Sequence, residues 1–163
     1  MASTDRAAAQ RRTIEALCRA ITEDKQQSTE GIHAPGATAE DLLFNLNLGD
    51  FDSYEDFGDK WIEAIDDYRF ELDEFFPSGG DRAVFTWLWS GTLKEGSLGA
   101  GRKFVNVRGV SLVTFSENDL ILKEVAWGDV HDLLRQLDLP PISFKPLYEL
   151  IGSDPAAAYE TGL

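Results

Sequence analysis

The chain has 163 residues, of which 43% are hydrophobic and 11% aromatic. This composition is enough for one domain with its own core and excludes a disordered chain. The 29 acidic residues outnumber the 15 basic ones and give a net charge of −14. Such a negative field repels phosphate backbones and anionic membrane surfaces, so we expect neither nucleic acid nor a membrane as a partner.

Several kinds of motif are missing from the sequence. The N-terminus has no hydrophobic signal core and no apolar run reaches membrane-spanning length, so a cytoplasmic location is predicted. The single cysteine and the two histidines have no zinc-type spacing, so no metal site is expected. No glycine loop suited to phosphate is present either, and no cofactor is expected.

The first predicted element is a helix. Its apolar residues recur at i, i+3, i+4 and i+7: Ile14, Leu17, Cys18 and Ile21. Thr4 or Asp5 is expected to cap the start of this helix, and the polar run 22–31 to end it. Cys18 is therefore predicted to be a small core residue and not a nucleophile.

An irregular segment, 28–50, follows the first helix, and Pro35 and Gly36 break any regular pattern there. We expect His33 to lie in a loop, either at the mouth of a pocket or simply on the surface.

A second helix is predicted from Ser53 onward. Its stripe consists of five large residues three or four positions apart: Tyr54, Phe57, Trp61, Ile65 and Tyr68. This stripe is either core or one wall of a pocket, with Tyr54 placed to donate a hydrogen bond. Asp67 lies where the helix gives way to the sheet, at a corner that can turn inward.

After this helix the hydrophobic period changes from 3.6 to 2. Strands are predicted from about residue 70 and over 82–93, 104–115 and 120–127. They are apolar on both faces over much of their length, so the sheet must be covered on both sides. Helices followed by a meander of long antiparallel strands indicate an α+β fold in a single domain, 1–163.

The end of the last strand carries a recognisable motif. Glu124 to Asp129, and then Leu133 to Pro140, resemble the closing motif of SnoaL-like polyketide cyclases, which belong to the nuclear transport factor 2-like superfamily. Asp129 and Gln136 keep the family spacing, whereas Asp138 replaces the usual glycine. Four stretches resemble other family elements, namely 13–21, 65–72, 81–92 and 101–115. The resemblance covers about residues 12–141 and leaves 142–163 as a C-terminal extension.

The resemblance implies a cone-shaped fold, in which a bent antiparallel sheet wraps around N-terminal helices and encloses an apolar pocket. It also implies cofactor-free acid–base catalysis of a cyclisation or isomerisation in secondary metabolism. The substrate would be a hydrophobic polycyclic or polyketide-like small molecule, and Asp129 would be the acid/base carboxylate. Members often pair through the outer sheet face, so a homodimer is expected.

The chemistry of Asp129 has two readings. On a strand it shares a face with Val125 and Trp127, and a carboxylate in an apolar cavity is suited to exchange a proton near neutral pH. Alternatively, Asp129 simply caps the helix that follows.

The other candidate residues are equally open. Trp87, Trp89 and Trp127 either line the substrate pocket or pack in the core or a dimer interface. Asn106 and Arg108 share a strand face that lines the pocket or is exposed. An epoxide hydrolase is a second reading, in which Asp67, Arg108 and Asp129 would activate water if all three faced inward. A non-catalytic binding domain is the third.

Overall fold

The computed structural model describes residues 2–24, 31–42, 62–95 and 101–139. The elements in chain order are α1 (Ala2–Arg19), the π-helical turn η1 (Ala20–Asp24), β1 (His33–Asp41), β2 (Ile65–Pro77), β3 (Arg82–Leu93), β4 (Lys103–Phe115), β5 (Ile121–Gly128) and α3 (Val130–Gln136). Among these residues, no helix is long and apolar enough to cross a membrane. The predicted residues Tyr54 and Trp61, and the extension 142–163, lie outside the described residues.

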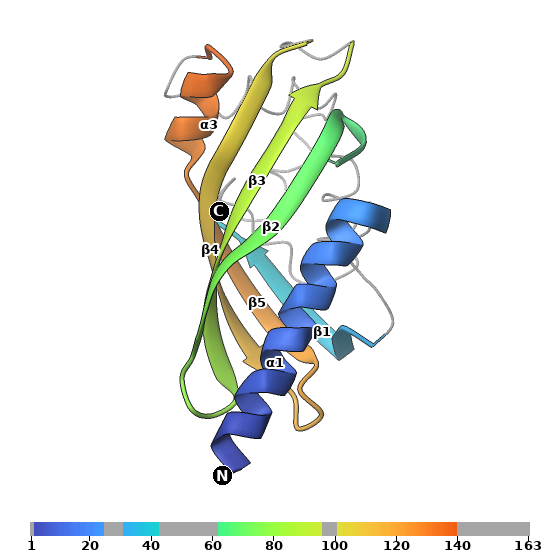
Figure 1. Ribbon diagram of the computed structural model, residues 1–163, viewed down its shortest axis with the longest axis vertical. Helices are drawn as coiled ribbons and strands as arrows, with labels where there is room; N and C mark the ends of the chain where they lie inside the picture. The colour runs from blue at the N-terminus through green and yellow to red at the C-terminus, as the bar shows by residue number, and fades with distance from the viewer. Residues whose placement is uncertain (1, 25–30, 43–61, 96–100, 140–163) are drawn as a thin grey trace.

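The five strands form one bent, unclosed sheet in the order β1-β5-β4-β3-β2 (Figure 1). β2 to β5 are an antiparallel meander, and β1 joins the free edge of β5 in parallel. α1 runs across one face of the sheet (Figure 1), which we call the inner face. The predicted α+β fold with a bent sheet is confirmed, and the parallel strand is an addition to it.

α1 lies on the inner face because of its apolar stripe. Ile14, Leu17, Cys18 and Ile21 are all buried, as predicted. The predicted cap at Thr4 or Asp5 is wrong, because the helix already begins at Ala2. Polar side chains fix both ends of this helical segment. Arg6 Nε of α1 donates to Asp119 Oδ1 in the β4–β5 turn at 2.9 Å, and Thr22 Oγ1 of η1 donates to the Phe70 carbonyl of β2 at 2.9 Å.

Two segments differ from the sequence prediction. Residues 33–41 form a strand and not a loop, because an edge strand tolerates Pro35 and a register shift between His33 and Thr38 accommodates the irregular stretch. Ile65, Asp67 and Tyr68 belong to β2 and not to a helix. Asp67 has a positive φ of 53°, and the pairing with β3 shifts between Asp66 and Arg69, so a bulge interrupts the strand period there.

Similar irregularities decide which residues of β4 and β5 face inward. In β4, Phe104 pairs with Gly91 of β3 but Val107 pairs with Trp89, so β4 has one extra residue in this stretch, where Asn106 has a φ of 54°. In β5, Phe115 pairs with Ile121 but Thr114 pairs with Lys123. Each extra residue moves the side chains beyond it to the opposite face. Beyond its irregularity, β5 therefore places Glu124 and Ala126 on the inner face.

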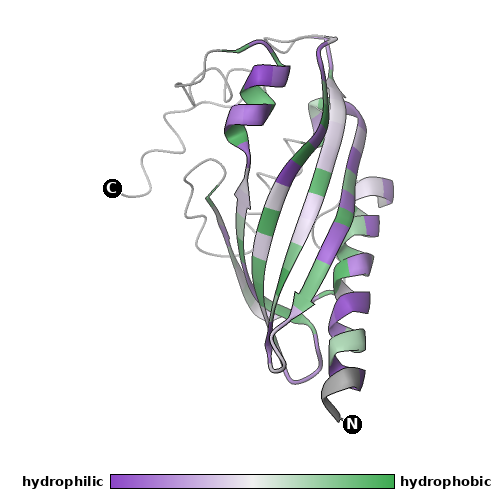
Figure 2. Ribbon diagram, turned by 60° about the vertical axis from the view of Figure 1, so that its left-hand side comes forward, coloured by the Kyte–Doolittle hydropathy of each residue, from purple (hydrophilic) through white to green (hydrophobic). Residues whose placement is uncertain are grey.

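Hydrophobic and hydrophilic residues alternate along the strands, as Figure 2 shows. In β3 the inward residues Phe85, Trp87 and Trp89 are buried, and the residues between them are only partly buried. The predicted face of this strand is thus confirmed.

Candidate functional site

A row of aromatic rings crosses the inner face from β2 to β4. Phe70 lies 4.9 Å from Trp87, Trp87 lies 6.1 Å from Trp89, and Trp89 lies 5.3 Å from Phe104, all measured between ring centroids. Gly109 makes room for this row, because a Cβ atom there would overlap the indole of Trp87. Trp87 and Trp89 are buried and pack in the core, so any contact with a substrate stays a prediction.

A buried polar network adjoins these rings. The indole Nε1 of Trp87 donates to the Ser111 hydroxyl oxygen at 3.0 Å, and Ser111 is fully buried. Because that oxygen accepts the hydrogen bond of the indole, the serine O–H is left to donate to the carboxyl of Glu124, whose pKa is lowered by a hydrogen bond with Ser111.

Glu124 itself is only 6% exposed. Its strand neighbours Ala39 and Val113 are buried and apolar. Burial raises the pKa of the Glu124 carboxyl, and the hydrogen bond with Ser111 opposes that rise. The six ion pairs found among the described residues do not include Glu124, so no cation in that set offsets the burial of this carboxyl.

The charge of this carboxyl affects the pKa of Cys18 in α1. Burial, and after it the negative charge of Glu124, raise the pKa of the Cys18 thiol to about 12. A thiol of this kind is not a nucleophile near neutral pH, which agrees with the core position predicted for Cys18.

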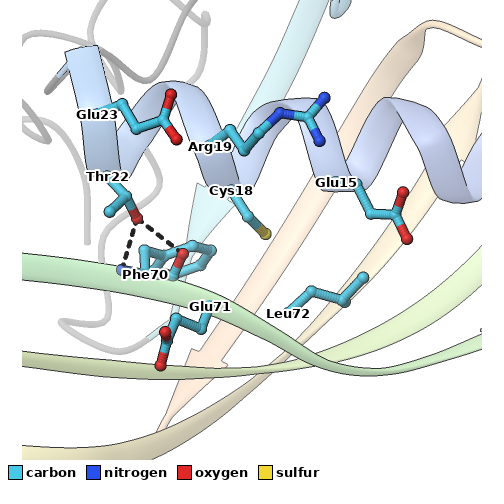
Figure 3. Close-up of a pocket in the computed structure, with 8 residues that line it drawn as sticks. All are labelled: Glu15, Cys18, Arg19, Thr22, Glu23, Phe70, Glu71 and Leu72. Carbon is cyan, nitrogen blue, oxygen red and sulfur yellow. Dashed lines mark hydrogen bonds between the residues drawn. The ribbon is translucent and has the colours of Figure 1, made fainter.

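A groove of about 320 Å³ opens on the other side of Cys18, between α1 with η1 and the edge strand β2 (Figure 3). Cys18, Phe70 and Leu72 form its apolar floor, and the charged residues at its rim are Glu15, Arg19, Glu23 and Glu71. Thr22 Oγ1 holds the two walls together through the backbone N–H and C=O of Phe70, both at 2.9 Å. Cys18 and Phe70 therefore border both the groove and the network behind it.

Asp129 lies elsewhere. Its side chain is exposed, and its carboxylate accepts from the Asp132 backbone N–H at 2.9 Å at the start of α3. The expectation that Asp129 faces an apolar cavity is wrong, and the helix cap is confirmed. The reason is the irregularity in β5, which turns Trp127 to the outer face, where it is 40% exposed.

Gln136, the second residue of the closing motif, has a structural contact as well. Its amide pairs with the backbone of Val105, accepting from the N–H at 2.7 Å and donating to the C=O at 3.0 Å. These bonds dock α3 on β4 at the irregular stretch, where the strand ladder is interrupted. The spacing of Asp129 and Gln136 thus serves to cap and anchor one helix.

The three residues of the hydrolase reading do not meet in the interior. Asp67, Arg108 and Asp129 are all exposed. Arg108 Nη2 lies 3.5 Å from Asp73 Oδ2 instead. The condition for the hydrolase alternative, that all three face inward, is therefore not met. Arg108 lies on the outer face of β4, and Asp67 lies at the bulge of β2.

The remaining candidates are spread over the molecule. Asn106 is exposed at the irregular stretch of β4, and Tyr68 is buried in the core. His33 begins β1 and is partly buried, and burial lowers its pKa to about 4. Among the described residues, no group of three or more His, Cys, Asp or Glu side chains is arranged to hold a metal ion.

The comparisons with known proteins agree with this architecture. The family model for the SnoaL-like domain matches residues 6–124, most of the chain. The chain belongs to this family. The match ends at Glu124 and does not reach the closing motif at Asp129, although that motif carried the resemblance in the sequence. No curated protein sequence matches the chain.

Solved structures similar to this SnoaL-like domain show its fold. A protein of ketosteroid isomerase-like fold from Catenulispora acidiphila, solved with trimethylamine, has a TM-score of 0.62 at 15% identity, over 79% of this chain and 94% of the other. A proposed polyketide cyclase from Acidithiobacillus ferrooxidans has a TM-score of 0.65 at 22% identity, over 80% and 94%. IdmH, a proposed polyketide cyclase from Streptomyces antibioticus, has a TM-score of 0.66 at 16% identity, over 80% and 99%.

Sequence reasoning missed Glu124 and Ser111 in this SnoaL-like domain. The one available signal was an acidic residue inside an otherwise apolar strand, LILKEVAW, but simple alternation assigned it to the outer face. Only the register of β4 against β5 shows that it points inward.

Proposed function

We propose that this SnoaL-like domain is a cofactor-independent cyclase or isomerase of secondary metabolism that moves a proton on an apolar, polyketide-like small molecule. The observation that carries the proposal is the groove between α1 and β2, whose apolar floor continues through Phe70 into the aromatic row of the inner face. An apolar site with few polar groups near its floor is the usual form of a small-molecule pocket.

The dimensions of the groove restrict the substrate. Its volume, about 320 Å³, is at the lower end of the range for ligand pockets, roughly 300–1,000 Å³. A flat molecule of two or three fused rings suits this space, with one ring face against Phe70. The family and the proposed polyketide cyclases among its structural relatives support the same substrate class.

The two alternative functions, hydrolysis and binding without catalysis, differ in their support. Hydrolysis through Asp67, Arg108 and Asp129 lacks support, because all three side chains are exposed. A binding domain without catalysis would use the same groove, and only a measurement of proton transfer separates it from an enzyme.

A bicyclic ketone, 2-tetralone, allows this measurement without knowledge of the natural substrate. We expect the protein to accelerate the exchange of its α-protons for deuterium in D₂O, followed by NMR, with saturation at high ketone concentration. Leu72→Trp fills the groove and is expected to suppress the acceleration. Leu88→Trp adds the same ring to the outer face of β3 and serves as the control. Exchange no faster than in buffer would refute proton-transfer catalysis.

The proposal includes a homodimer formed through the outer sheet face. Large apolar side chains are exposed there on three strands, namely Phe76 of β2, Leu112 of β4 and Trp127 of β5. The strand register connects them through Val84, Val110 and Val125 into one apolar patch. A patch of this kind on a sheet face favours burial against a second copy.

A further inference from the structure

We propose that Glu124, and not Asp129, is the catalytic acid/base of this SnoaL-like domain, and that Ser111 and Trp87 position its carboxyl. The inference rests on the proposed function and assigns its proton-transfer step to a residue other than Asp129, to which the resemblance gives the acid/base role.

The geometry separates the two carboxyl groups. Glu124 is 6% exposed on the inner face, and its negative charge raises the pKa of Cys18, which lines the groove. Asp129 is exposed, and one of its carboxylate oxygens accepts from the backbone N–H of Asp132 in the first turn of α3. α1 and β2, which line the groove, lie on the side of the molecule opposite α3 (Figures 1 and 2). Neither carboxyl lines the groove, but Glu124 lies on the inner face behind the groove lining, whereas Asp129 caps α3.

The groove also offers a direction of approach. Cys18 and Phe70 are the two floor residues that border the network, one through the charge of Glu124 and the other through its ring contact with Trp87. A ketone must pass between them to present its α-carbon to the Glu124 carboxyl, which lies behind the groove lining and is only 6% exposed. Glu124 itself is buried, so its carboxyl is shielded from bulk water.

The step is balanced without a co-reactant. The α-carbon–hydrogen bond breaks, the proton bonds to a carboxylate oxygen of Glu124, and the electron pair left behind forms the enolate. The protonated carboxyl then returns a proton to the enolate carbon, or to an oxygen after a new carbon–carbon bond has closed a ring. A carboxyl whose pKa is raised by burial is suited to both halves of this exchange near neutral pH.

Ser111 and Trp87 act through Glu124. Trp87 Nε1 donates to Ser111 Oγ at 3.0 Å, which leaves the serine hydroxyl to donate to the carboxylate. That bond orients Glu124 and keeps its pKa lower than burial alone would. β1 and β4 present Ala39, Ser111 and Val113 around the carboxyl, and the titratable group that α1 places against it is Cys18.

The decisive experiment compares Glu124→Gln with Asp129→Asn in the 2-tetralone exchange assay. Gln keeps the shape of the side chain and removes the base, so we expect a loss of at least about 100-fold, the usual contribution of a general base. Asp129→Asn is expected to stay within about threefold of the wild type, since Asn also caps helices. Glu117→Gln, in the exposed β4–β5 turn, is the control.

A third variant, Ser111→Ala, tests whether Ser111 acts on Glu124 through the pH–rate profile, which a purely structural role of Ser111 would leave unchanged. Without the hydroxyl the pKa of Glu124 rises further, so the midpoint of the pH–rate profile is expected to shift to higher pH. If the wild type exchanges and Glu124→Gln exchanges equally fast, the assignment is overturned while the proposed function stands. If the wild type does not accelerate exchange, both are wrong.

Discussion

The burial of Glu124 has a measurable effect on stability, which Glu124→Gln isolates. Gln has the same shape, accepts the same hydrogen bond from Ser111 and carries no charge. Wild type and variant are therefore expected to be about equally stable in acid, where Glu124 is protonated in both the folded and the unfolded chain.

The difference grows as the pH rises. The unfolded carboxyl ionises at its ordinary pKa of 4.5, whereas burial raises the pKa of the folded one. The stability that the proton contributes to the wild type is complete below the unfolded pKa and is lost as the pH rises through the folded pKa. Between these two values, each pH unit stabilises Glu124→Gln over the wild type by about 1.4 kcal/mol, and above the folded pKa the difference is constant.

Urea unfolding followed by tryptophan fluorescence, at intervals from about pH 4 to about pH 8, measures this difference. The pH at which it levels off is the folded pKa of Glu124. The matched control is Glu117→Gln, which removes an exposed carboxyl and is expected to show no such growth. A difference between Glu124→Gln and wild type that does not change with pH would refute the argument from burial.

Three further changes test the surrounding structure. Gly109→Ala pushes a Cβ into Trp87 and is expected to destabilise the fold by about 1–3 kcal/mol in thermal unfolding. Gly80→Ala is the control and is expected to be nearly neutral, because nothing lies within 4 Å of the added atom. Equal effects of the two changes would contradict this packing of Gly109 against Trp87. Gln136→Ala leaves the backbone of β4 without its partner and should cost about 1–3 kcal/mol, with faster amide exchange at α3; unchanged protection would be inconsistent with that anchor. Leu112→Glu places a charge in the outer apolar patch and is expected to convert a dimer to a monomer in analytical ultracentrifugation, and a dimer that persists would place the interface elsewhere.

The regular parts of the fold could be predicted from the sequence because their periods are undisturbed. β3 runs over Arg82–Leu93 as predicted, and its aromatic residues alternate without interruption. The stripe of α1 likewise follows a strict helical period and is buried throughout. In both elements one face is buried, and the spacing of the apolar residues predicts which face that is.

The site could not be predicted because it depends on the irregular positions. One extra residue in β5 reverses which side chains face inward, so Glu124 enters the interior and Trp127 leaves it. A bulge leaves only a weak trace in a pattern of single residues, since it is defined by the pairing of two strands. The motif around Asp129 was identifiable in the sequence, but its contacts cap and anchor a helix.

β1 was missed for a related reason. Pro35 and Gly36 normally break regular structure, yet an edge strand with an interrupted ladder accepts both. The predicted homodimer, the cytoplasmic location and the single-domain boundaries stay predictions.

The protonation of Glu124 and its contact with a ligand can be observed together by NMR. In protein labelled with ¹³C at the glutamate carboxyl carbons, the Glu124 resonance is the one that disappears in Glu124→Gln. This resonance is expected to titrate at a higher pH than an ordinary carboxyl and to shift when 2-naphthol, a planar enol mimic, binds in the groove. A Glu124 resonance that titrates as an exposed glutamate does, or that 2-naphthol leaves unchanged while the Asp129 signal in aspartate-labelled protein moves, would contradict the assignment of Glu124 as the acid/base.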